Sequence, residues 1–139
     1  MSVLNTEARR ALTAGRLGHL VTLNSDGSPQ VSVVWLGLEG DDIVVGHMMG
    51  GRKIENIARD SRVALSVEAE GANPIGMGNC LIIHGTAALV DGGAPELLSR
   101  LAETYIGPGV KFPPMDDPPS GHVIRIRPQR VGGVGPWAS

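Results

Sequence analysis

Apolar and polar residues alternate over several short stretches of this chain, a pattern typical of half-buried β-strands. Three such runs lie within residues 19–47, separated by the turn-forming stretches NSDGSP and EGDD, and they predict an antiparallel meander. Further strands are predicted at VALSVEA and CLIIHGTAALV, with the Gly-rich EGANPIGMGN as a long connection, and one or two more at HVIRIRP and RVGGVGPWA.

Three segments instead carry apolar residues at helical spacing. Residues 6–14 can be capped by Asn5 or Thr6, and residues 94–105 carry a proline at an early, tolerated position. Between them, Ile54, Ile57 and Ala58 form the apolar stripe of a short helix. Because strands and helices do not alternate regularly, we expect an antiparallel α+β domain or a small barrel.

The second strand of the predicted meander has an unusually polar face. Gln30, Ser32 and Val34 point to one side of the strand, because successive side chains alternate between the two faces. Val31 and Val33 point to the other. The face that carries Gln30 and Ser32 is thus more polar than packing against a hydrophobic core requires.

Composition narrows the classes of function. The chain has 139 residues, which fits one domain spanning 1–139, and its 12 basic and 14 acidic side chains argue against a general nucleic-acid binder. The single cysteine, Cys80, forms no internal disulfide. No apolar run is long enough to cross a membrane, and the N-terminus lacks a signal peptide's apolar centre, so we expect a cytoplasmic protein.

Several common catalytic motifs do not occur in the sequence. There is no phosphate-binding loop ending in Gly-Lys-Ser/Thr and no Gly-x-Ser-x-Gly elbow. The four histidines are too scattered to predict a metal site, so none is expected. If the protein is an enzyme, a bound cofactor is therefore expected to supply the reactivity.

Arg52 and Lys53 directly follow Gly50 and Gly51 at the start of the middle helix. A helix N-terminus is already positive, so two cations there are unfavourable unless an anion is close. One interpretation is that the backbone N–H groups and both cations bind a phosphate. The other is that both side chains are solvated and the glycines only form a turn.

Three segments together carry a resemblance to a known family: SDGSPQVSVVWL, GRKIENIARDSRVALSV and the final RIRPQRVGGVGPW. They resemble the pyridoxamine-phosphate-oxidase-like, FMN-binding split β-barrel proteins, and are most similar to the actinobacterial F-420-dependent (deazaflavin-dependent) oxidoreductases of the B group. The resemblance implies a mostly β, antiparallel, six- to seven-stranded split barrel with about three short helices. It also implies a homodimer with cofactors at the subunit interface.

The same resemblance implies the site residues. Arg52 and Lys53 would hold the cofactor phosphate, while a groove would be formed by the second strand and by the main chain that ends the third. The implied groove residues are Gln30, Ser32 and Val33 on the second strand, and His47, Met48 and Met49 at the end of the third. Asn56 would brace the helix, and Asp60 and Arg62 would be structural.

Other assignments stay open at the level of sequence. Trp35 and Trp137 are candidates for covering an apolar ring face, with ordinary packing as the alternative for Trp35 and pinning of the chain end as the alternative for Trp137. Residues 107–121 form either a flap on the substrate side or a surface loop. Three arginines near the first helix form a candidate track for the polyglutamate tail of F-420, with solvated surface as the alternative: Arg9, Arg10 and Arg16.

The resemblance predicts hydride transfer from reduced F-420 to a small-molecule substrate that the sequence does not identify. FMN is the rival cofactor, because it offers a phosphate to the same Arg-Lys pair. A protein that binds a flavin or deazaflavin without catalysis is the alternative from a different class, and a structural dimer with an empty groove is a third.

Overall fold

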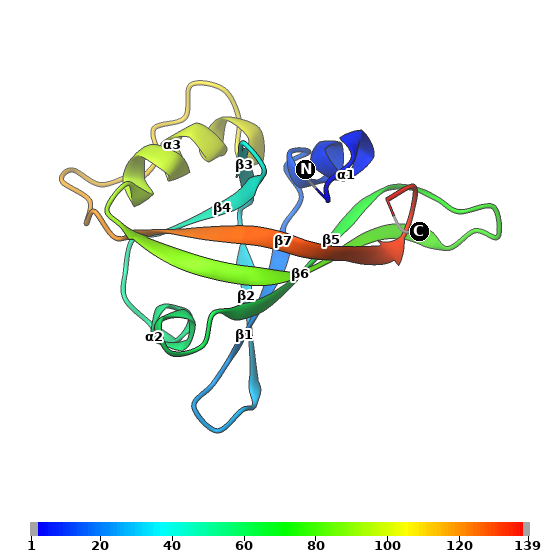
Figure 1. Cartoon of the computed structure of the whole chain (residues 1–139). Helices are drawn as coiled ribbons and strands as arrows, with labels where there is room; N and C mark the ends of the chain where they lie inside the picture. Colours follow the sequence, from blue (N-terminus) through cyan, green and yellow to red (C-terminus); the bar gives the residue numbers. More distant parts are fainter. Residues whose placement is uncertain (1–2, 138–139) are drawn as a thin grey trace.

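The computed structural model describes residues 3–137 and has one antiparallel seven-stranded sheet with three helices (Figure 1). The sheet order is β2-β1-β5-β6-β7-β4-β3. The predicted mostly β split-barrel class is confirmed. The elements are α1 Thr6–Leu12, β1 Gly18–Leu23, β2 Pro29–Val34, β3 Gly37–Glu39, β4 Asp42–His47, α2 Arg52–Arg59, β5 Arg62–Ala72, β6 Gly78–Asp91, α3 Ala94–Tyr105 and β7 His122–Val134.

The predicted meander at residues 19–47 is wrong. β1 and β2 form a hairpin at one edge of the sheet, and β3 and β4 form a second hairpin at the opposite edge. The chain leaves the sheet between Val34 and Gly37, where the Leu36 N–H donates to the Tyr105 hydroxyl at 2.8 Å instead of to a neighbouring strand. Since the sequence pattern is apolar throughout this stretch, it did not reveal the break.

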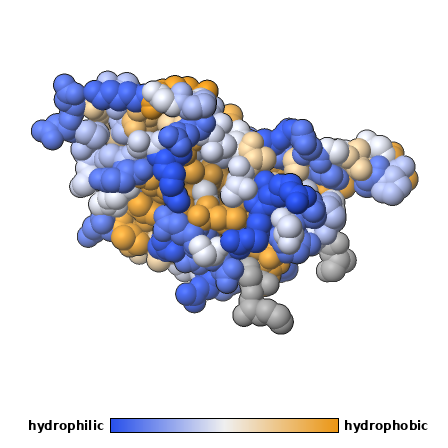
Figure 2. Space-filling model, turned by 90° about the horizontal axis from the view of Figure 1, so that it is seen from above, coloured by the Kyte–Doolittle hydropathy of each residue, from blue (hydrophilic) through white to orange (hydrophobic). Residues whose placement is uncertain are grey.

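The connection between β5 and β6 is shorter than its Gly-rich sequence predicts. Both strands extend into it, and Asn73 closes the turn by donating its N–H to the Met77 carbonyl at 2.8 Å. The result is an arm that projects from the body of the protein, with apolar atoms at its tip (Figure 2). Ile75 is 81% exposed there and Met77 is 51% exposed.

β7 is one continuous strand of 13 residues, where one or two strands were predicted. Pro128 fits inside it because the register with β6 shifts between His84 and Gly85, and proline is tolerated at such a bulge. A side chain at Gly85 would collide with the Arg127 carbonyl, so the bulge also requires this glycine.

The core lies on the inner face of the sheet and is aliphatic. Its most deeply buried members, all at most 1% exposed, include Leu20, Leu65, Leu81, Ile83, Ile124 and Ile126. A smaller cluster joins α3 to the other side of β4 through Val44, Leu97 and Leu101. The longest helix has 12 residues, and no helix within residues 3–137 is long and apolar enough to cross a membrane.

One buried side chain, Asn56 in α2, fixes that helix to the β1–β2 hairpin. It is 2% exposed, and its amide donates to the Thr22 hydroxyl and to the Asn24 side chain, both at 3.0 Å. Arg59 donates to the Asn56 oxygen at 2.9 Å and to the Leu23 carbonyl at 2.6 Å. The expected bracing role of Asn56 therefore has a direct structural basis.

We predict that Asn56→Ala lowers the free energy of unfolding by about 1–3 kcal/mol, because buried hydrogen-bonding groups lose their partners. Chemical denaturation of the ligand-free protein measures this change. Glu55→Ala, at the exposed neighbouring position, is the control and should change stability by less than about 0.5 kcal/mol. Equal effects of the two substitutions would contradict the bracing role.

Candidate functional site

The start of α2 is an uncapped helix N-terminus. Its N-cap residue is Gly51, in an extended conformation, and no side chain makes a capping hydrogen bond there. A Cβ built at Gly50 would meet nothing within 4 Å, so the chain before the helix borders open space. The N–H groups of the first turn are therefore available to an external acceptor.

Lys53 adds a desolvated positive charge to this helix start. The side chain is half-buried, and burial lowers the pKa of its ammonium group. Among residues 3–137 it has no ion pair and no hydrogen bond to a carboxylate. A charge held in this way is costly to the free protein unless an anion binds beside it.

Arg52 lies beside the β1–β2 turn. It lines a polar groove of about 400 Å³ together with the turn and the exposed side of α2. Its charge helps to lower the pKa of Asp26, although hydrogen bonds from Ser28 contribute more. Arg52 therefore lines the polar groove, whereas Lys53 is half-buried and does not line it.

His47, at the end of β4, lies under the start of α2. Its Nε2 atom is buried without a hydrogen-bond partner among residues 3–137, and it would lie 3.7 Å from a Cβ built at Gly51. Burial lowers the pKa of His47, and the charges of Lys53 and His122 lower it further, while a backbone hydrogen bond with Gly50 acts in the opposite direction.

The residues proposed from β2 lie on two different faces. Gln30 pairs directly with Thr22 and Ser32 with Leu20, so both share the inner face on which α2 packs. Val33 points outward and is 58% exposed. β2 is an edge strand, which leaves the hydrogen-bonding groups along its outer side without a partner strand.

Met48 and Met49 lie in the segment between β4 and α2. Met48 is half-buried and Met49 is 64% exposed. Gly121, directly before β7, approaches this segment so closely that a side chain there would collide with the His47 carbonyl and Met48 Cα. Its φ of 57° also favours glycine.

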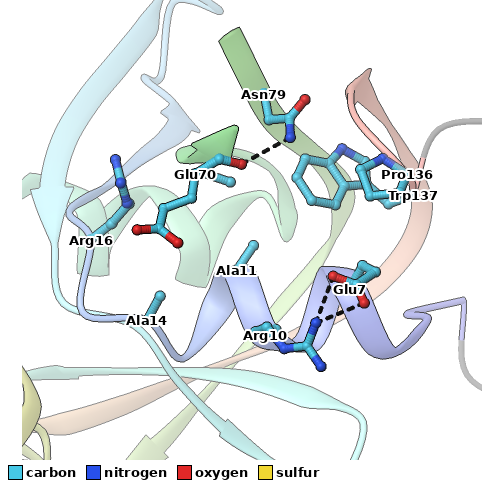
Figure 3. A pocket seen from close by; sticks show the side chains of 10 residues that line it. Glu7, Arg10, Ala11, Ala14, Arg16, Glu70, Asn79, Pro136 and Trp137 are labelled. Atoms are coloured by element: carbon cyan, nitrogen blue, oxygen red, sulfur yellow. Dashed lines mark hydrogen bonds and ion pairs between the residues drawn. The ribbon is translucent and has the colours of Figure 1, made fainter. Parts of the chain in front are cut away.

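Trp137 lies far from the start of α2 within the same chain. β7 begins at His122, which pairs with His47, and ends at Val134, so Trp137 lies beyond the other end of a strand about 40 Å long. The indole N–H donates to the Cys80 carbonyl at 3.2 Å. The ring borders a cavity of about 540 Å³ beside α1 (Figure 3).

Trp35 packs against other aromatic rings. Its ring is stacked on Tyr105, with centroids 5.1 Å apart, and it contacts Phe112 at 5.0 Å. Phe112 belongs to the 107–121 segment, which is thereby attached to the body of the protein. At its far end, this segment accepts a hydrogen bond from the Ala94 N–H through Ser120 at 3.0 Å.

Two of the three arginines near α1 are already paired. Arg9 donates to the Gly40 carbonyl at 2.9 Å, and Arg10 forms an ion pair with Glu7 at 2.7 Å (Figure 3). Arg16 is exposed and makes no ion pair within residues 3–137. Among those residues, no cluster of three or more His, Cys, Asp or Glu side chains is placed to hold a metal ion.

Sequence reasoning missed His122 and Gly121. His122 faces His47 only because β7 pairs with β4, two strands that are 75 residues apart in the chain. Nothing in the local pattern of HVIRIRP indicates that partner. The Ser-Gly-His stretch before the strand was the available signal, since a glycine there can mark a close backbone approach.

Comparison with known proteins decides the family. The family described as Pyridoxamine 5'-phosphate oxidase matches residues 4–135. The chain belongs to this family. No curated protein sequence matches it significantly.

Solved structures agree with this membership. The fold of the chain is similar to that of an F420 reductase, with 25% identity, a TM-score of 0.74, and coverage of 93% of this chain and 98% of the other. A conserved hypothetical protein, Rv2991 from Mycobacterium tuberculosis, is 25% identical with a TM-score of 0.74. The match covers 94% of this chain and 84% of the other. An FAD-binding protein from Mesorhizobium loti is 22% identical with a TM-score of 0.65, over 94% of each chain. This similarity supports the fold and nothing further.

The residues at the start of α2 fit a phosphate-bearing cofactor of the flavin type. The uncapped first turn offers N–H donors, Lys53 lacks an internal counterion, and His47 has a buried nitrogen without a partner. These are the features that an anion would complete.

We predict that Lys53→Met leaves the ligand-free protein at least as stable as the wild type at pH 7. The lowered pKa means that the folded state binds the Lys53 proton less tightly than the unfolded state, so the charge opposes folding below that pKa. Methionine keeps the apolar stem without the charge. Thermal and chemical unfolding measure the difference.

Lys111→Met is the matched control, because Lys111 is exposed and paired with Asp116 at 3.3 Å. It should change stability by less than about 0.5 kcal/mol. A loss of more than about 1 kcal/mol in Lys53→Met alone would show that the Lys53 charge already has a stabilising partner inside the protein.

Proposed function

We propose that this protein is an oxidoreductase that binds the deazaflavin coenzyme F-420 and catalyses hydride transfer to a small-molecule substrate. Family membership and the similarity to an F420 reductase support a flavin-type cofactor. The observation that carries the proposal is the start of α2, where a half-buried Lys53 and a free helix N-terminus have no internal anion. When bound, F-420 supplies the hydride chemistry.

In this proposal each part of the site has its own task. Lys53 and the first-turn N–H groups of α2 bind the phosphate, and Arg52 adds a second charge from the groove side. Gln30 and Ser32, with the main chain at Val33, line the cofactor site from β2, outside the polar groove that Arg52 borders. The main chain at His47, Met48 and Met49 borders the ring system, so the protein orients the cofactor and limits access of water.

The proposal includes a homodimer with the cofactor between the subunits. Val31 and Val33 leave apolar side chains 57% and 58% exposed on the outer face of the edge strand β2, which supports an association surface there. A dimer also allows Trp137 to border the cofactor site of the partner subunit. The start of α2 in its own chain is out of reach, because it lies at the opposite end of β7.

FMN is the second candidate cofactor. It has a phosphate for the same residues, and structural relatives include an FAD-binding protein. The arginine track for a polyglutamate tail gains little support, since Arg9 and Arg10 are engaged with other groups and only Arg16 is free among the described residues. A binding protein without catalysis uses the same residues and differs only in turnover.

We predict that ligand-free protein binds F-420 at micromolar or lower concentration in a fluorescence titration, and binds FMN more weakly. Lys53→Ala should weaken F-420 binding by about 10- to 150-fold, because a charge-assisted hydrogen bond is worth about 1.5–3 kcal/mol. Lys111→Ala is the control and should bind like the wild type.

The other results of the same titration have definite meanings. Tighter binding of FMN would assign the protein to the flavin branch of its family. Binding of neither compound would refute a cofactor role for the start of α2. F-420 binding, without oxidation of reduced F-420 in a screen of small-molecule acceptors, would favour the carrier function.

A further inference from the structure

His47 and His122 form a pair of imidazoles at the edge of the proposed phosphate site. They are direct cross-strand partners in β4 and β7, so their side chains lie on the same face of the sheet. Within the part of the chain that the structure describes, Nε2 of His47 and Nδ1 of His122 are both buried without a hydrogen-bond partner. The proposed function uses only the main chain of His47, so it leaves both imidazoles without a task.

The charges around the pair are distributed unevenly. Lys53 faces His47 from α2, and Asp91 faces His122 from β6, with its carboxylate 3.4 Å from Nε2. Arg52, the other cation of α2, is exposed and lies toward Asp26. His47 is therefore bordered by positive groups, whereas the outer end of the pair is next to an exposed carboxylate.

This arrangement lowers the pKa of His47 in the ligand-free protein, which favours the neutral imidazole. Burial contributes most to its lowered pKa, followed by the charges of Lys53 and His122. An anion at the start of α2 reverses the electrostatic part, because it neutralises the field of Lys53 and adds a negative charge beside the imidazole. It can also give the buried Nε2 atom an acceptor for a donated proton.

We propose that the His47–His122 pair takes up one proton from solvent when the phosphate of a deazaflavin binds at the start of α2. The proposal rests on the proposed function and adds a task for two side chains. The proton is assigned to the pair rather than to one ring, because the charge of His122 acts on His47. The Asp91 carboxylate lies 3.4 Å from His122 Nε2, at the end of the pair away from Lys53.

The consequence is a pH-dependent affinity with a defined sign. The pair has a higher pKa in the loaded protein than in the free protein, so affinity rises as pH falls through the interval between the two values. Each unit of difference makes binding about tenfold tighter below the interval than above it.

Proton NMR of the imidazole C–H signals, recorded against pH for free and F-420-saturated wild-type protein, tests this directly. We expect the His47 and His122 titrations to move to higher pH on loading. His84 is exposed on β6 and serves as the internal reference signal. The phosphate-free deazaflavin chromophore should leave the pair's titrations unchanged.

Calorimetry in buffers of different ionisation enthalpy counts the protons taken up during F-420 binding. Titrating groups of the ligand contribute the same number of protons with every variant. A difference between variants therefore measures the protons that the protein takes up. His47→Gln and His122→Gln should each lose the protein's share of the uptake, whereas His84→Gln should retain it. The NMR titration of wild-type protein remains decisive if either variant fails to fold.

Binding of F-420 with unmoved His47 and His122 titrations would overturn this inference and leave the proposed function intact. Movement of their titrations with the phosphate-free chromophore would also overturn it, because the phosphate would not be the cause. Failure of F-420 to bind at all would remove both proposals together.

Discussion

The proposed site depends on one electrostatic constraint, which is a positive charge at the start of α2 without an internal counterion. Lys53 is half-buried, and the helix whose first turn it occupies has an uncapped, electropositive end. Proteins rarely leave such a charge desolvated and unpaired, because the cost falls on the stability of the fold. An external anion is the simplest partner for it.

The sheet topology holds this charge in place. α2 connects the two edges of the sheet, because it follows β4 at one side and is hydrogen bonded to the β1–β2 hairpin at the other. Asn56 makes that second attachment from a buried position. The close approach of Gly121 keeps the end of β4 against β7, which sets His47 beside His122. Elements that are distant in sequence thus meet at the start of α2.

Much of the fold followed from local sequence signals. The three helices were predicted, that of residues 94–105 with the observed bounds, and so were the NSDGSP turn and the strand-rich class. The failed prediction was the meander, since strand order depends on pairings that periodicity does not encode. At the break, the Leu36 N–H donates to the hydroxyl of Tyr105, which is 69 residues away in the chain.

The candidate site was predictable only in its charge. Gly-Gly-Arg-Lys at a helix start indicated an anion. The structure adds that Arg52 lines the polar groove while Lys53 does not, that Trp35 packs on Tyr105, and that His122 pairs with His47. Such relations arise from tertiary packing. The placement of Trp137 at the far end of β7 likewise required the complete register of the strand.

A crystal structure of the protein with F-420 tests the central claim most directly. The phosphate is predicted to lie within hydrogen-bonding distance of the first-turn N–H groups of α2 and of Lys53 Nζ, in a groove formed by two copies of the chain. A phosphate bound elsewhere, with Lys53 still unpaired, would contradict the claim that this charge exists to bind the cofactor.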